Sequence, residues 1–186
     1  MTAVDAWDAN LTVQWTMSRT ANDFATPIAT ADHGALHLEA RANYEAIHAQ
    51  SAFVGGTFAL GDTIKLEATP MVGGVGGALR GPIAGLEATV SAGPFDWYVE
   101  AEHVWDRGDA GGSYTYAWSQ LGYRPAAAQW ARFGMASQRT RIYGGDREVQ
   151  HGPFLELTRG KVTFGGYWFS PGSSQQVLIA SVAVAF

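Results

Sequence analysis

The sequence predicts an all-β protein, a transmembrane antiparallel up-and-down β-barrel of twelve strands, with ten strands as the alternative. Three observations support this prediction. Apolar and polar residues alternate with a period of two along most of the chain, short and long connections alternate between these segments, and tryptophans occur in pairs on the apolar face. Residues 1–186 are expected to form a single domain.

The alternation is clearest at the N-terminus. From Trp7 to Arg19, apolar residues such as Leu11 and Val13 occupy one parity, and polar residues occupy the other. A helix would distribute these residues around its axis, so the pattern indicates a strand with one apolar face. The pattern returns in seven later segments: Leu36 to Ala46, Ile64 to Val72, Leu86 to Ala92, Trp97 to Glu102, Ala131 to Ala136, Leu155 to Leu157 and Leu178 to Phe186.

Connections of two lengths separate the strands. The short turns are Asp32 to Gly34, Gly61 to Thr63, Gly93-Pro94 and Arg159 to Lys161, and the longer loops are Arg19 to Asp23, Ala46 to Gln50, Gly73 to Pro82, Asp106 to Ser113, Ile142 to Glu148 and Ser170 to Ser174. This alternation is typical of outer-membrane barrels. An even strand count also requires a weakly patterned strand over Phe24 to Ala31.

The composition excludes several classes of protein. The chain is 47% apolar and 16% charged, which excludes a disordered chain, and it has no cysteine for a disulfide or a thiolate metal site. No nucleic-acid partner is expected, because the net charge is −5 and Lys65 and Lys161 are the only lysines. No apolar run approaches the ~18 to 20 residues of a transmembrane helix.

The tryptophan spacing favours a barrel with its apolar face outward. Trp7 and Trp15 lie eight residues apart, as do Trp97 and Trp105, and this separation matches the depth between two interfacial aromatic girdles. A soluble barrel with an apolar ligand inside shows the same alternation and remains a minor alternative. The residues expected at the lipid interface are Trp7, Trp15, Trp97, Trp105, Trp168 and Phe186.

The polar parity then faces the lumen. The expected pore-lining residues are Glu39, Arg41, Glu45, Lys65, Glu67, Glu87, Glu100, Glu102, Arg132 and Glu156. Seven acids facing three bases would favour cations weakly in a water-filled pore. The alternative is a plug, in which the basic residues cross-link the glutamates. Twelve strands lie between the filled eight-stranded and the open sixteen-stranded barrels, so both alternatives stay open.

The C-terminal strand ends at Phe186 and resembles the signal that the barrel-assembly machinery reads in bacterial outer-membrane proteins. Five further segments resemble small, uncharacterised porin-like outer-membrane proteins of Gram-negative bacteria: His37 to Glu45, Gly61 to Gly74, Tyr114 to Pro125, Trp130 to Tyr143 and Gln150 to Pro171. The resemblance implies a porin fold in the outer membrane and brings no activity. The outer loops here are short and glycine-rich, so little chain is expected to fold into the pore.

No catalytic residue and no cofactor are predicted. His103 lies on the lipid-facing parity, and Asp106, Asp109 and His151 would form a rim site only if loops converged. His37, Glu39 and Glu67 form a weak metal pattern, against which a hydrogen-bonded luminal histidine is favoured, so no metal site is predicted. Gly73 to Gly77 lacks the Lys and Ser/Thr of a phosphate-binding loop and is expected to be a flexible loop.

Arginines near the long loops suggest a contact with lipopolysaccharide, because guanidinium groups pair with phosphate. The candidates are Arg107, Arg139, Arg141 and Arg147, with ordinary loop solubility as the alternative.

The resulting hypothesis is an outer-membrane channel for passive diffusion of small polar solutes with weak cation preference. Its partners would be the lipid bilayer, lipopolysaccharide, the assembly machinery and the solutes. A secretory signal peptide, absent from this sequence, is expected. Removing Glu67 and Glu100 together is expected to lower the cation preference. The alternative is a closed structural barrel or a component of an envelope assembly.

Overall fold

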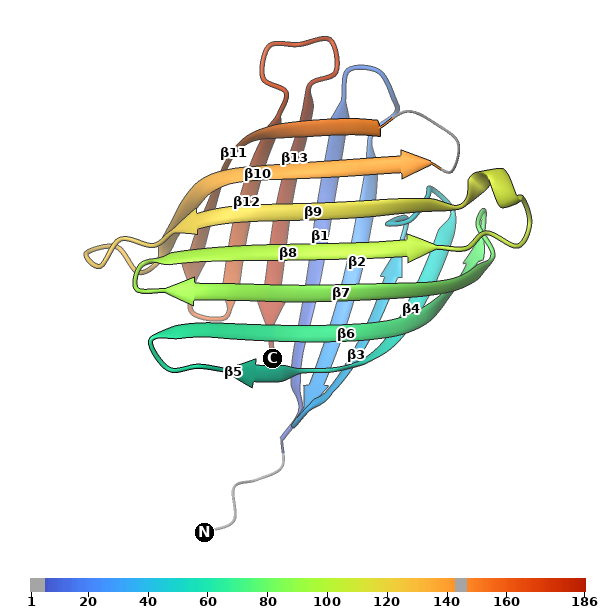
Figure 1. The fold of residues 1–186 in the computed structure, drawn as a ribbon. Helices are drawn as coiled ribbons and strands as arrows, with labels where there is room; N and C mark the ends of the chain where they lie inside the picture. The colour runs from blue at the N-terminus through green and yellow to red at the C-terminus, as the bar shows by residue number, and fades with distance from the viewer. Residues whose placement is uncertain (1–5, 143–146) are drawn as a thin grey trace.

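The chain forms a closed antiparallel β-barrel, seen in a computed structural model that describes residues 6–142 and 147–186 (Figure 1). A 3-10 turn, Ala110–Gly112, lies between β8 and β9. The strand segments are β1 (Asp8–Ser18), β2 (Phe24–His33), β3 (Leu36–Ala42), β4 (Ala49–Gly56), β5 (Phe58–Leu60), β6 (Ile64–Gly77), β7 (Gly81–Ala92), β8 (Phe95–Val104), β9 (Tyr114–Tyr123), β10 (Ala131–Ile142), β11 (Arg147–Arg159), β12 (Val162–Phe169) and β13 (Val177–Ala185).

These segments make twelve strands of the barrel, because β4 and β5 are two parts of one strand. Both pair with β6 in the same register, with Gly55 opposite Met71 and Phe58 opposite Ala68. Between these pairs the ladder passes Pro70, which has no N–H to donate. The predicted twelve-stranded fold, including the weakly patterned second strand, is confirmed.

The barrel closes where β1 pairs with β13, from Asn10 opposite Ala185 to Ser18 opposite Val177. The backbone N–H of Phe186 donates to the Ala9 carbonyl oxygen (2.9 Å), which joins the last residue to the first strand. No described strand edge is therefore left open around the barrel.

The connections separate the barrel into two ends. At the turn end, where β1 begins and β13 finishes, tight hairpins contain Gly34, Gly93 and Gly160 with φ of 59°, 57° and 61°. The connection 124–130 at this end is longer than the others. The loop end carries the connections 19–23, 43–48, 78–80, 105–113 and 170–176, together with 143–146, which lies outside the described residues.

One predicted loop is wrong. Gly73 to Gly77 is not a flexible loop but the last part of β6, paired with β4 on one side and β7 on the other. Glycine is needed at Gly73, because a Cβ there would lie 2.2 Å from the Ala52 carbonyl oxygen of β4. The glycines thus reflect close strand packing.

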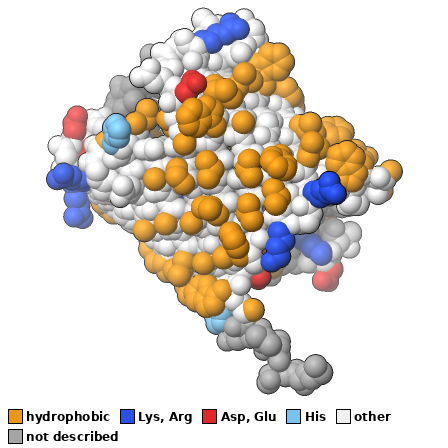
Figure 2. All heavy atoms as spheres, turned by 180° about the vertical axis from the view of Figure 1, so that it is seen from behind, with side chains coloured by type: hydrophobic (Ala, Val, Ile, Leu, Met, Phe, Trp, Pro, Cys, Tyr) orange, Lys and Arg blue, Asp and Glu red, His pale blue; other side chains and the backbone are white. Residues whose placement is uncertain are grey.

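The outer surface of the barrel is apolar. Figure 2 shows hydrophobic side chains spread over one whole face of the wall. They include Val72, Leu121 and Phe164, which are 60%, 57% and 55% exposed. An exposed apolar band of this kind is typical of barrels that cross a bilayer. In the described part of the chain, no helix is long and apolar enough to span a membrane.

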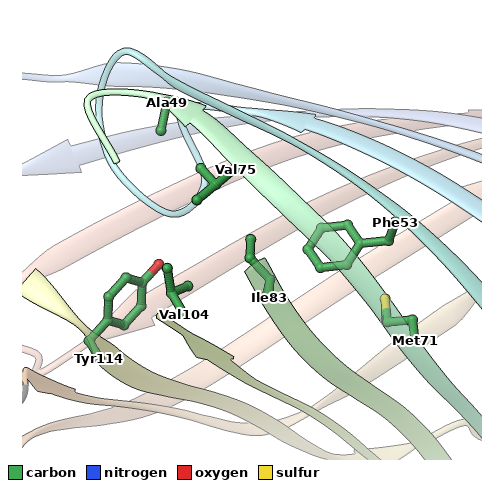
Figure 3. Packing of buried hydrophobic residues seen from close by; sticks show 7 residues of the cluster. All are labelled: Ala49, Phe53, Met71, Val75, Ile83, Val104 and Tyr114. Carbon is green, nitrogen blue, oxygen red and sulfur yellow. The ribbon is translucent and has the colours of Figure 1, made fainter. Parts of the chain in front are cut away.

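The barrel interior is partly filled by hydrophobic side chains. One cluster contains Ala49, Phe53, Met71, Val75, Ile83, Val104 and Tyr114, and Figure 3 shows them pointing into a common space. A second cluster contains Trp118, Ala136, Phe154, Tyr167, Phe169 and Ile179. Between these clusters the inner wall carries the charged residues.

Candidate functional site

The loop between β3 and β4 folds into the barrel at the loop end. Asn43 and His48 adopt positive φ of 57° and 67°, and the Asn43 side chain donates to the Ala25 carbonyl oxygen (3.0 Å) and accepts from the His48 N–H (2.9 Å). Tyr44 packs edge-on against Tyr116, with ring centroids 5.8 Å apart. The expectation that no outer loop enters the pore is therefore wrong, because this short loop is fixed by side-chain hydrogen bonds.

Buried Arg41 of β3 lies at the centre of a cluster of four carboxylates. Its Nε donates to Glu39, and its Nη1 lies 2.9 Å from Glu100 Oε1 and 3.1 Å from Glu102 Oε2. The fourth carboxylate, Glu87, is 3.9 Å from Nη2. These ion pairs cross the lumen, because β3 is not a neighbour of β7 or β8. One guanidinium thus faces more negative charge than it neutralises.

A second ion-pair cluster surrounds Arg132 of β10. The guanidinium pairs with Asp96 of β8 and with Glu156 of β11, the latter at 2.9 Å, and it donates to Gln120 Oε1 (2.6 Å). Its Cζ lies 4.8 Å from the centre of the Phe154 ring. Charge is closer to balance here than around Arg41.

The lumen holds two cavities that meet at a common wall. The loop-end cavity, of about 580 Å³, extends from Ala21 in the first loop to Tyr98 and Gln120. The turn-end cavity, of about 850 Å³, extends from the same two residues to Pro94 and Gln129 at the other end. The two cavities therefore lead toward opposite ends of the barrel.

The walls of the two cavities differ in charge. The charged residues of the loop-end cavity are Glu39, Glu87, Glu100, Glu148 and Arg41, a formal excess of three negative charges. The turn-end cavity has Asp96, Glu156, Arg124 and Arg132, which balance formally. Any electrostatic preference for cations therefore originates in the loop-end cavity.

The predicted pore-lining residues divide into those near the cavities and those at the turn end. Glu45 is buried beside Glu102 under the inward loop, where its Oε1 accepts from Ser51 Oγ (2.5 Å). Lys65 and Glu67 share the parity of inward Thr69, but they are exposed near the turn end of β6 and line neither cavity.

The residues considered for chemistry are used in structural contacts. His37 lies 2.7 Å from Asp32 and 3.3 Å from Glu39, and no group of three or more His, Asp or Glu side chains suited to a metal occurs among the described residues. Asp106 and Asp109 accept backbone N–H bonds within their own loop. His151 is exposed on the outward parity of β11.

The predicted interface aromatics lie on the outer surface, with 45% to 67% of each exposed: Trp7, Trp15, Trp97, Trp105, Trp168 and Phe186. Sequence reasoning missed Phe95 and Trp130 at the turn end, exposed by 54% and 59%. Arg107 and Arg139 are exposed at or near the loop end, whereas the Arg141 and Arg147 side chains lie outside the described part.

Sequence reasoning also missed the aromatic wall of the lumen. Tyr44, Tyr98, Tyr116 and Trp118 line the loop-end cavity. Tyr98, Tyr116 and Trp118 share the parity of Glu100 or of their cross-strand partners, so the period-two pattern places them inward. Counting only charged residues on that face left them out.

Comparison with known proteins agrees with this geometry. A solved KdgM porin in complex with disordered oligogalacturonate superposes with a TM-score of 0.68 at 9% identity, covering 95% of this chain and 99% of that chain. A second KdgM porin structure gives 0.65 at 9% identity with the same coverage. OpdL of Pseudomonas aeruginosa gives 0.50 at 7% identity, covering 97% of each chain.

The fold is that of a porin-like barrel. At these identities the likeness concerns the fold alone. No protein-family model and no curated sequence matches the chain.

Proposed function

We propose that this protein is an outer-membrane channel for passive diffusion of small polar solutes, with a weak preference for cations. The observation that carries the proposal is the pair of cavities that lead from opposite ends of an apolar-surfaced barrel to Tyr98 and Gln120. The excess negative charge of the loop-end cavity supports the preference for cations. The loop end is assigned to the outside, as in other barrels with short periplasmic turns.

The solute of one structural neighbour does not suit this lumen. That KdgM porin was solved with oligogalacturonate, a polymer of anionic uronates. The carboxylates around Arg41 would repel such a chain, so cationic or neutral solutes are the better candidates.

The test is conductance of the refolded protein in a planar bilayer under a KCl gradient. The expected result is discrete steps with a reversal potential on the cation-selective side. Replacing Glu87 and Glu100 by Gln is expected to move the reversal potential toward zero. Glu67→Gln is the matched control, because Glu67 lines neither cavity. Anion selectivity, or no shift in the double variant, would refute the cation preference.

A second candidate function is a closed structural barrel. The observation that favours it is the set of ion pairs from Arg41 across the lumen, together with the Tyr98 and Gln120 wall between the cavities. A folded, inserted protein that conducts no current would support this candidate and refute the channel.

We also propose that Arg107 and Arg139 contact lipopolysaccharide phosphates from the outer rim. Both are exposed near the loop end. Weaker binding of lipopolysaccharide by the R107A/R139A double variant than by Lys161→Ala, at the turn end, would support this contact.

A further inference from the structure

We propose that the loop-end cavity contains a binding site for a small organic ammonium ion, held between Glu87, Glu100 and the ring of Trp118. This inference rests on the proposed function, because the ligand would reach the site through the same channel. It adds a specific binding step and a chemical class of ligand to a weak preference for cations.

The first argument is the placement of two carboxylates side by side. Glu87 and Glu100 lie directly opposite each other on β7 and β8, on the inner face. Like charges at such cross-strand positions are destabilising. Arg41 is the cation that contacts them, and it is also engaged by Glu39 and Glu102. A second cation in the cavity would relieve this repulsion.

The second argument is an incompletely satisfied buried oxygen. Glu100 is 8% exposed, lines the loop-end cavity, and its Oε1 has no hydrogen-bond partner among the described residues. This oxygen lies 2.9 Å from Arg41 Nη1, within ion-pair distance but without hydrogen-bond geometry. A buried carboxylate oxygen in this state lacks a donor, and an ammonium N–H or a polarised N-methyl group would satisfy it.

The third argument is the aromatic wall, which favours an organic cation over a metal ion. Trp118 lies directly opposite Glu100 on β9, and Tyr98 lines the same cavity one inward position away along β8. Aromatic faces attract ammonium ions through the ring quadrupole, and Trp does so best. A cavity of about 580 Å³ is also within the size range of small-molecule sites.

Polar groups on the facing wall would fix the rest of the ligand. Thr12, Gln14 and Thr16 of β1 line the cavity with hydroxyl and amide groups. The class of ligand is therefore a small ammonium ion that also carries a hydrogen-bonding group.

Choline is a suitable probe, and its neutral isostere 3,3-dimethyl-1-butanol is the control for shape. Calorimetric titration of the folded protein in detergent is expected to detect choline at millimolar concentration, and the isostere at least tenfold more weakly. Glu100→Gln and Trp118→Leu are each expected to raise the Kd for choline at least tenfold. Glu156→Gln, in the turn-end cavity, is expected to leave it unchanged.

Glu87→Gln is the second variant in case Glu100→Gln does not fold, because the Glu87 side chain is 26% exposed and its exchange disturbs less packing. Equal binding of choline and the isostere, no binding of choline, or choline binding unaffected by both glutamate variants would overturn the inference. Its failure is distinguishable from failure of the proposed function. Cation-selective current without choline binding refutes only the site, whereas choline binding by a silent barrel refutes only the channel.

Discussion

At the scale of single residues, Arg41 has the largest expected effect on stability. Replacing it by Ala leaves the carboxylates around it, of which Glu39, Glu100 and Glu102 are buried, without their counter-ion. Removing one partner from a buried charge cluster costs about 3–5 kcal/mol, so the free energy of unfolding should fall by about that amount. Urea titration of the folded barrel in micelles measures the change.

Arg19→Ala is the control for this prediction. Arg19 is exposed in the first loop, where its guanidinium donates to the Ser173 carbonyl oxygen (3.3 Å). Its loss should change the unfolding free energy by less than about 0.5 kcal/mol. Equal effects of the two substitutions would show that the charge cluster does not stabilise the fold.

A glycine in β11 gives a second prediction at this scale. A Cβ on Gly152 would lie 1.7 Å from the Trp168 carbonyl oxygen of β12, whereas a Cβ on Gly166 would meet nothing within 4 Å. Gly152→Ala should therefore lower the unfolding free energy by about 1–3 kcal/mol, as overpacking does. Gly166→Ala is the matched control in β12, and comparable stability of the two variants in urea titrations would contradict the close approach.

At the scale of elements, the β3–β4 loop narrows the loop end of the lumen. Its Tyr44 ring lines the loop-end cavity and packs on Tyr116. Tyr44→Ala should enlarge the cavity and raise single-channel conductance. Ile47→Ala, in the same loop but 45% exposed, should leave conductance unchanged. Unchanged conductance in the Tyr44 variant would mean that the narrowest point lies elsewhere.

The strands themselves follow from the sequence more completely than the loops do. The alternation along β1 and β13 places Leu11, Val13, Leu178 and Val182 outside, where all are at least 37% exposed. The ends of β6 were not predictable in the same way. Glycine has no side chain to show a parity, and only pairing with β4 and β7 makes Gly73–Gly77 a strand.

At the scale of the whole molecule, the outer surface requires an apolar environment. Exposed side chains such as Leu60, Val72 and Trp130 are distributed over the wall. Dilution of the folded protein below the critical micelle concentration of its detergent should cause aggregation, measured by light scattering. A clear, monodisperse solution at high concentration would instead support a soluble barrel with an apolar ligand inside.

The sequence by itself determined which face of each strand is polar and in what order the strands follow, because a period of two is a local property of the chain. That is sufficient for an up-and-down barrel, in which neighbours in sequence are neighbours in space. It also placed Glu39, Arg41 and Glu100 on the inner face.

Only the tertiary structure decided what these inner residues do. Arg41 and Glu100 lie on strands that are not paired, and their contact depends on barrel diameter and strand stagger, which no local pattern encodes. The same holds for the division of the lumen into two cavities and for the apolar packing of Phe53 with Ile83. The alternation of side chains fixes direction along one strand, whereas contacts across a closed barrel depend on where all twelve strands are placed.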